Sequence, residues 1–288
     1  MAAVSDLGGA VVSRQSRRWE GFGFLAPLLL FALIVFDIPL LIVVFWSFSD
    51  PVTGFPSLGT YAAFVESGSY ARIIWRTFLI ASEVTIATAL IGYPLAYWIS
   101  RLEQRSQFIA IGLVTMTFWV SILVRTYGWI VILGNGGIVN RWLQAAGITS
   151  RPVEFLYNEG GVAVGMINVL LPFLVLPLYA AMRSVDPRLI HVAETLGASR
   201  LQIFWRVFFP LTAAALGASM VLVFILSLGF YITPAILGGG RVPLIANMMD
   251  LLINKFARWE MAAVNSVVLL IVTLAFYGLY QRLREKAA

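Results

Sequence analysis

The sequence predicts an all-α membrane protein with six transmembrane helices and one polar, helix-forming loop between the fourth and fifth of them. Hydrophobic residues make up 60% of the 288 residues, charged residues only 12%, and the mean hydropathy is +0.89. A soluble domain of this size has no core large enough for that apolar content. The apolar residues gather in six long stretches, and a segment with helix-capping signals separates the fourth stretch from the fifth.

Each of the six stretches has the roughly 20 apolar residues that cross a hydrocarbon core about 30 Å thick. The first stretch follows the basic sequence RQSRRWE, as in a signal peptide, but it is too long for one and no small-residue cleavage site follows it. We therefore expect a retained span after a cytoplasmic tail over 1–18, within one membrane domain over 19–288. The expected spans lie near 22–48, 74–99, 108–133, 162–183, 211–237 and 261–281.

The distribution of lysine and arginine predicts the orientation in the membrane. With both termini in the cytoplasm, the inner side carries twelve of these residues and the outer side seven, while Arg125 lies within a span. Segment 184–210 is then cytoplasmic. The outer loops 49–73 and 134–161 are rich in glycine, proline, asparagine and aromatic residues, which predicts turns and short interfacial helices.

Several classes of function are excluded by residue type. The net charge of +6 is scattered at the ends of apolar stretches, so no nucleic-acid-binding patch is expected. The chain has no cysteine, and its one histidine, His191, has no second ligand nearby in the sequence, so no metal site is expected. Neither Lys255 nor Lys286 belongs to a Gly-Lys-Ser/Thr phosphate loop. The chain therefore binds no ATP through such a loop.

Segment 184–210 contains the start and stop signals of two short helices. Asp186 followed by Pro187 predicts an N-cap and a first helical position, and Gly197 predicts the end of that helix. Ser199 and Gln202 then match a capping box, which opens a second helix expected to run to Pro210.

Both predicted helices carry an apolar stripe at helical spacing. The stripes consist of Leu189, Val192, Ala193 and Leu196 on the first helix and of Leu201, Phe204, Trp205 and Phe208 on the second. One interpretation is a helix that lies on the membrane surface. The other is a docking surface for a cytoplasmic partner.

The spacing within this segment resembles the EAA loop of binding-protein-dependent ABC importer permeases, the type I importers. That loop has Glu-Ala-Ala, a glycine four residues later, and Ile-x-Leu-Pro after nine more residues. The aligned residues here are His191, Val192, Ala193, Gly197, Val207, Phe209 and Pro210. The segments LVRTYGWIVILGNGGIVN (123–140), VDPRLIHVAETLGAS (185–199) and FYITPAILGG (230–239) resemble the spermidine/putrescine permease subfamily, over roughly residues 20–283.

The resemblance implies a subunit of a bacterial inner-membrane importer. Its partners would be a periplasmic substrate-binding protein, a second permease subunit, identical or related, and a dimer of a cytoplasmic ATPase that binds ATP and magnesium, with no cofactor in this chain. Segment 184–210 would be the coupling-helix loop that docks on the ATPase. The residues implied in that docking are Arg188, His191, Ala193, Glu194, Gly197, Ala198, Ser199 and Pro210.

The chain departs from the family pattern at His191, where the family has glutamate. The ion pair that such a glutamate makes with a basic ATPase residue is not available in the same form. Glu194 is a helical neighbour three residues later and could replace it.

Three ionisable residues, Asp37, Glu83 and Arg125, lie within the expected spans at similar depths in the outer half of the membrane. A charge that faces lipid is unfavourable, so we expect all three to face the protein interior or a wet cavity. Because consecutive antiparallel spans bring equal depths together, Glu83 and Arg125 are predicted to form an ion pair.

A cationic solute requires carboxylates and aromatic faces along its path. The candidates are Asp37, Trp119, Tyr127, Trp129 and Tyr231, although aromatic residues in spans also serve as packing residues and interface anchors. In FYITPAILGGG, Pro234 and the glycines at 238–240 predict a broken helix end.

We therefore expect a permease subunit of an importer for polyamines or a related small solute. Substrate identity stays open, because relatives with this loop handle opines, thiamine, ferric iron or phosphonates. A secondary transporter is the main alternative, but it would be favoured by inverted repeats and midplane acidic groups, which the sequence lacks. An intramembrane hydrolase would need a GxSG motif or facing aspartates in neighbouring spans, and neither is found.

Overall fold

The computed structural model describes residues 26–50 and 53–287, so the expected tail over 1–18 lies outside the described residues. Within them the chain is helical, and its extended pairing is limited to a bridge between Ser49 and Pro56. In this described part of the chain, six helical stretches are long and apolar enough to span a membrane, which confirms the predicted fold class. They are Ala26–Ser47, Ser69–Arg101, Ile122–Ala145, Glu159–Arg183, Arg200–Leu228 and Trp259–Gly278.

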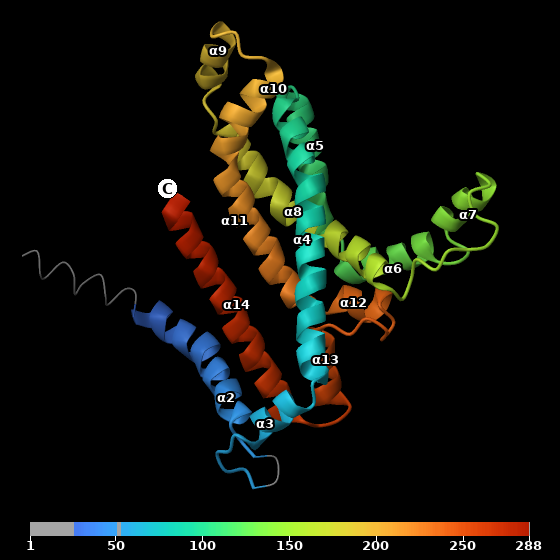
Figure 1. Ribbon diagram of the computed structural model, residues 1–288, viewed down its shortest axis with the longest axis vertical. Helices are drawn as coiled ribbons and strands as arrows, with labels where there is room; N and C mark the ends of the chain where they lie inside the picture. Colours follow the sequence, from blue (N-terminus) through green and yellow to red (C-terminus); the bar gives the residue numbers. More distant parts are fainter. Residues whose placement is uncertain (1–25, 51–52, 288) are drawn as a thin grey trace, which may run out of the picture.

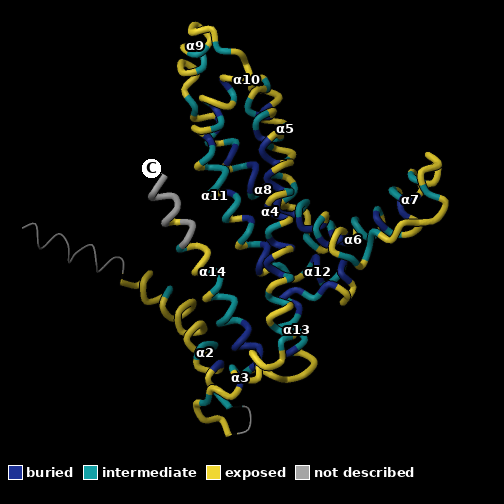
Figure 2. Tube along the Cα trace, in the orientation of Figure 1, coloured by how far each residue is buried: buried dark blue, intermediate teal, exposed yellow. Residues whose placement is uncertain are grey.

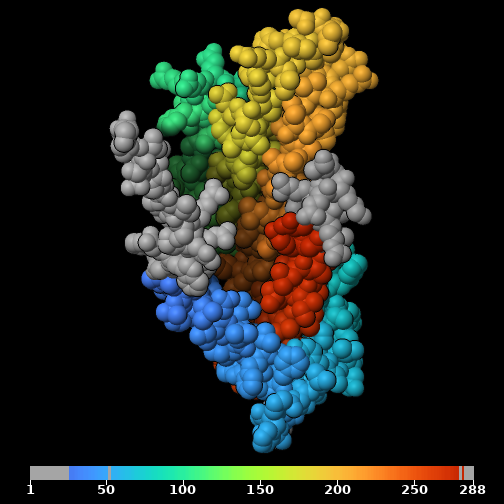
Figure 3. All heavy atoms as spheres, turned by 90° about the vertical axis from the view of Figure 1, so that its left-hand side faces the viewer, coloured from blue at the N-terminus to red at the C-terminus, as the bar shows by residue number. Residues whose placement is uncertain are grey.

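Three long helices form the centre of the molecule: α4 (Ser69–Arg101), α8 (Glu159–Arg183) and α11 (Phe209–Leu228) (Figure 1). Helices α2 (Ile38–Ser47) and α14 (Trp259–Ala287) pack against each other beside this centre. The short helix α9 (Pro187–Thr195) lies at one end of the molecule, and α3 (Gly59–Glu66) lies at the other (Figures 1 and 3).

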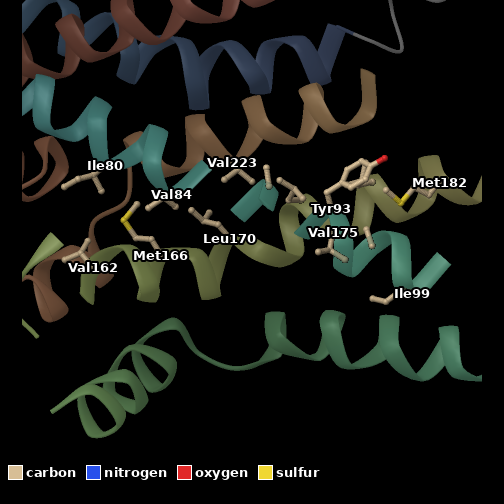
Figure 4. Packing of buried hydrophobic residues seen from close by; sticks show 14 of the residues in the cluster. Ile80, Val84, Tyr93, Ile99, Val162, Met166, Leu170, Val175, Met182 and Val223 are labelled. Atoms are coloured by element: carbon tan, nitrogen blue, oxygen red, sulfur yellow. The ribbon is translucent and has the colours of Figure 1, made fainter. Parts of the chain in front are cut away.

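The core lies between α4, α8 and α11, where the tube is dark blue in Figure 2. Val84 of α4, Leu170 of α8 and Val223 of α11 are all buried in it (Figure 4). A Cβ added to Gly92 of α4 would lie 2.6 Å from Leu174 Cδ2 of α8, so these two helices meet at a glycine. Outward-facing apolar residues remain exposed, as expected for helices that contact lipid or another subunit.

The predicted third span over 108–133 is wrong as a single helix. The structure has α5 (Gln104–Met116), a 3₁₀ turn at Thr117–Trp119, an extended Val120 and then α6 (Ile122–Leu133). No proline or glycine marks this break in the sequence, and its polar residues are limited to Thr117 and Ser121 at its two ends. Helix α6 packs on α8 and on α12 (Ile232–Leu237) and continues into an arm that ends with α7 (Ile138–Ala145) (Figure 1).

The predicted fifth span over 211–237 has the wrong bounds, because the observed helix both begins and ends earlier in the sequence. Helix α10 (Arg200–Ile203) continues through a π turn at Phe204–Phe208 into α11, so Pro210 does not end a helix. At its other end α11 stops at Leu228, before Gly229, and α12 follows as a separate helix. The broken helix end expected around Pro234 is therefore present, but it begins earlier.

Proline explains the π turn before α11. Pro210 has no N–H, and its ring excludes the carbonyl of the residue four positions earlier. The helix widens there instead, and the Phe209 N–H bonds to the Phe204 carbonyl, five residues back. The first span repeats this arrangement, since a π turn at Leu33–Asp37 precedes Pro39.

Candidate coupling segment and substrate pathway

The local signals in the coupling segment, residues 184–210, fold as predicted. The Asp186 side chain accepts the Arg188 N–H at 2.9 Å and caps α9 at Pro187. Gly197 follows the end of α9 with a φ of +77°, a conformation that favours glycine. Ser199 and Gln202 form the expected capping box, with the Ser199 N–H 2.8 Å from Gln202 Oε1. Two short helices therefore meet at Gly197.

The apolar stripe of α9 faces away from the protein. Leu189, Val192 and Leu196 are exposed, Leu196 at 81% of its surface. Further along the segment, Leu201 and Trp205 are also exposed, at 68% and 56%. We call these five residues the apolar coupling face. It lies at the end of the molecule that α9 forms (Figure 2).

The predicted stripe of the second helix is divided between two surfaces, which corrects the single docking stripe expected from the sequence. Phe208 is buried and Phe204 half-buried, and both pack edge-on against Tyr97 of α4, with ring centroids 5.2 and 5.3 Å apart. The Arg101 guanidinium lies 5.0 Å from the Tyr97 ring centroid and 5.5 Å from that of Phe208. The coupling segment is thus packed onto the end of α4.

The residues predicted to meet the ATPase are accessible, with two exceptions. Ala193 and Ala198 are half-buried, whereas the others, Arg188, His191, Glu194, Gly197, Ser199 and Pro210, are exposed. His191 Nδ1 lies 2.8 Å from the Pro187 carbonyl oxygen, in the first turn of the same helix. That hydrogen bond orients the imidazole of this exposed side chain. Within the described ranges no three His, Cys, Asp or Glu residues are grouped to hold a metal.

The break between α11 and α12 places Tyr231 against α13 (Ile245–Asn254). Asn247 Nδ2 donates to the Tyr231 carbonyl at 3.0 Å, and the Tyr231 hydroxyl lies near the Asp250 carboxylate. The interaction with this carboxylate raises the pKa of Tyr231. Asn254 Nδ2 donates to Asp250 Oδ1 at 2.6 Å and so orients the carboxylate. Asp250 was not a predicted site residue, because it lies outside the expected spans, in a short helix that the sequence did not predict.

The other predicted pathway residues are dispersed. Asp37 is exposed in the first π turn, Trp119 is 87% exposed beside the α5–α6 break, and Tyr127 is 58% exposed on α6. Trp129 packs against the core, as expected of a packing residue. No ring contact or hydrogen bond joins any two of the five predicted residues in the described part of the chain.

The predicted ion pair between Glu83 and Arg125 is wrong. Glu83 is exposed on α4, and Arg125 Nε and Nη1 are buried without a hydrogen-bond partner. The prediction assumed that spans two and three form a straight hairpin. Because the third span breaks after Met116, α6 carries Arg125 against α8 and α12 instead.

The comparisons with known proteins give relatives of one kind, although no family model matches the chain. The chain is 35% identical over 215 residues to the spermidine/putrescine transport system permease protein PotB of Haemophilus influenzae, which covers 74% of each chain. It is 30% identical over 203 residues to PotB of Escherichia coli K12, over 70% of this chain and 74% of that protein. The chain belongs to the PotB family of ABC transporter permeases.

The PotB-family fold is also present in solved structures. A bacterial alginate ABC transporter in complex with alginate pentasaccharide-bound periplasmic protein contains a chain that matches with a TM-score of 0.76, at 18% identity and over 94% of this chain and 96% of that one. The overall fold is therefore that of an ABC transporter permease. As a PotB-family permease subunit, the chain is not an enzyme.

Proposed function

We propose that this PotB-family chain forms part of the path by which a bacterial importer carries polyamines, or another small cationic solute, across the inner membrane. The names of its relatives support this substrate class, and so does the carboxylate–tyrosine pair at the break after α11. Both termini, with the tail over 1–18, would lie in the cytoplasm, and residues 19–288 would form one membrane domain.

The apolar coupling face is the observation that carries the proposed partnership with an ATPase. Its five exposed apolar side chains, gathered on α9, α10 and the π turn that follows, would be removed from water by a docked partner protein. In the proposed assembly, α9 docks in one copy of an ATPase dimer, which binds ATP and magnesium. A periplasmic substrate-binding protein delivers solute to the opposite end, and a second permease subunit, identical or related, completes the path.

The proposed mechanism is a mechanical link. Closure of the ATPase dimer would displace α9, and the rings of Phe204 and Phe208 would pass this displacement to Tyr97 at the end of α4. Because α4, α8 and α11 share one core, they would move together and open the path alternately to the two sides. Glu194 is exposed on α9 and supports a contact with a basic ATPase residue that His191 does not make.

Reconstitution tests this function directly. The chain, purified with its ATPase, second permease subunit and binding protein, is placed in proteoliposomes, and uptake of radiolabelled putrescine and spermidine is measured. We expect uptake to require both internal ATP and the binding protein. Uptake that runs on an ion gradient without ATP would show a secondary transporter and contradict the proposal.

A further inference from the structure

The break between α11 and α12 combines three features that attract a cation. The first is the Asp250 carboxylate, which is half-buried, accepts a hydrogen bond from the neutral Asn254 amide and lies near the neutral Tyr231 hydroxyl. No lysine or arginine nitrogen in the described residues lies within 4 Å of it. A carboxylate has about four acceptor positions, so this one keeps acceptors for a further donor.

The second feature is the ring of Tyr231. It is 41% exposed, and its backbone carbonyl is held by Asn247, so the residue is fixed while its face stays accessible. An aromatic face attracts ammonium groups through the ring quadrupole. The hydroxyl at the end of this ring lies near the Asp250 carboxylate.

The third feature is the end of α11 at Leu228, directly before the break. The last turn of a helix leaves carbonyl groups without intrahelical partners, and the helix dipole is negative at that end. Helix α11 continues without interruption from α10 at Arg200, so this is the end of a long helix.

The location suits a solute that enters from the outer side. The Ile245 N–H at the start of α13 donates to Thr77 Oγ1 of α4 at 3.0 Å. Thr77 is eight residues from Ser69, the outer start of α4, which corresponds to about 12 Å along the helix. The break therefore lies in the outer part of the membrane domain, opposite the coupling segment.

We propose that Asp250 and Tyr231 bind an ammonium group of the transported solute at the break between α11 and α12. This proposal rests on the proposed function as an importer of cations and adds a specific site to it. The carboxylate provides the charged acceptor, the tyrosine ring covers one face of the ammonium group, and the carbonyl end of α11 provides further acceptors.

The test uses the complete transporter in proteoliposomes with radiolabelled putrescine as the probe. Asp250→Asn keeps the size and removes the charge, and we expect it to lower the ATP-dependent uptake rate about tenfold or more, since hydrogen bonds to a charged group are the stronger kind. Asp250→Glu keeps the charge and should retain more uptake than the asparagine variant. The matched control is Glu66→Gln, which removes an exposed carboxylate at the end of α3 and should leave uptake unchanged.

Two substitutions of Tyr231 separate the contribution of the aromatic ring to uptake from that of the hydroxyl group. Tyr231→Phe keeps the ring and should lose less uptake than Tyr231→Leu, which removes both. Yield of the assembled complex and ATPase stimulation by the binding protein should stay near wild type in every variant, because the site is remote from the coupling segment. If the Asp250→Asn variant fails to assemble, the two Tyr231 variants test the site instead. Equal uptake by Tyr231→Phe and Tyr231→Leu would then contradict it.

The outcomes distinguish the two proposals. If wild-type vesicles take up putrescine and the Asp250→Asn variant transports within twofold of them, the site is wrong and the proposed function stands. If wild-type vesicles take up neither putrescine nor spermidine, the cationic substrate class is wrong and the site falls with it.

Discussion

The hydroxyl oxygens of Tyr93 and Thr212 lie 2.9 Å apart in the interior and join α4 to the first turn of α11. The Thr212 hydroxyl also donates to the Phe208 carbonyl at 3.1 Å, so its single proton is used and Tyr93 must be the donor of the shared bond. The Tyr93 ring meanwhile packs edge-on against Phe209, at 5.7 Å between centroids. This bond fixes α11 to α4 directly after the coupling segment.

The direction of the Tyr93–Thr212 bond predicts unequal effects of two conservative substitutions. Tyr93→Phe leaves Thr212 bonded to Phe208 and should lower the free energy of unfolding by about 1 kcal/mol. Thr212→Val leaves the Tyr93 hydroxyl buried without its acceptor and should lower it by about 1–3 kcal/mol. Unfolding of both variants in detergent checks this order, and a larger loss for Tyr93→Phe would contradict it.

Local signals in the sequence predicted local structure well. Asp186 with Pro187, Gly197, and Ser199 with Gln202 each determine the conformation of one turn, and the structure has all of them in place. The number of spans was predictable as well, because a helix in lipid requires a long apolar run wherever it lies, although the bounds of the third and fifth spans were wrong.

Features that depend on tertiary packing were not predictable from one sequence. The break after Met116 contains no proline or glycine, and α6 beyond it packs on α8 and α12, a contact that one sequence does not reveal. The predicted Glu83–Arg125 ion pair was wrong for the same reason, since α6 beyond the break carries Arg125 away from Glu83. Phe204 and Phe208 share a stripe with Leu201 on a helical wheel, but α4 covers the two phenylalanines and leaves the leucine exposed.

Gly197 provides a test of the turn between α9 and α10. A Cβ added there meets no atom within 4 Å, so a substitution acts only through the backbone φ of +77°. Gly197→Ala should therefore cost about 1 kcal/mol of stability, and Gly197→Asn less, because asparagine adopts the left-handed conformation more readily. Thermal unfolding of the purified protein measures both. Equal losses for alanine and asparagine would contradict this account.

Gly165 tests the contact between α8 and α12. A Cβ at this position would lie 2.6 Å from Thr233 Cγ2 and would also collide with Leu237. Gly165→Ala should destabilise the protein by about 1–3 kcal/mol through overpacking. Gly128→Ala is the matched control, since Gly128 lies within α6 and its added Cβ meets nothing within 4 Å, and alanine there should be neutral or slightly stabilising. Similar unfolding curves for the two variants would show that α12 can move away from α8 without loss.

The apolar coupling face predicts a separation between folding and assembly. Leu196 and Leu201 are 81% and 68% exposed, so Leu196→Ser and Leu201→Ser remove almost no contact within the chain and should leave its unfolding temperature unchanged. If an ATPase covers them, each substitution should weaken its association about tenfold, since burial of a leucine contributes about 1.5–3 kcal/mol when complete. Ile148→Ser, at a residue 69% exposed in the loop after α7, should alter neither property. Co-purification of the ATPase and its stimulated activity measure the effect, and normal association of the Leu196→Ser/Leu201→Ser double variant would instead support a helix pair that rests on the membrane surface.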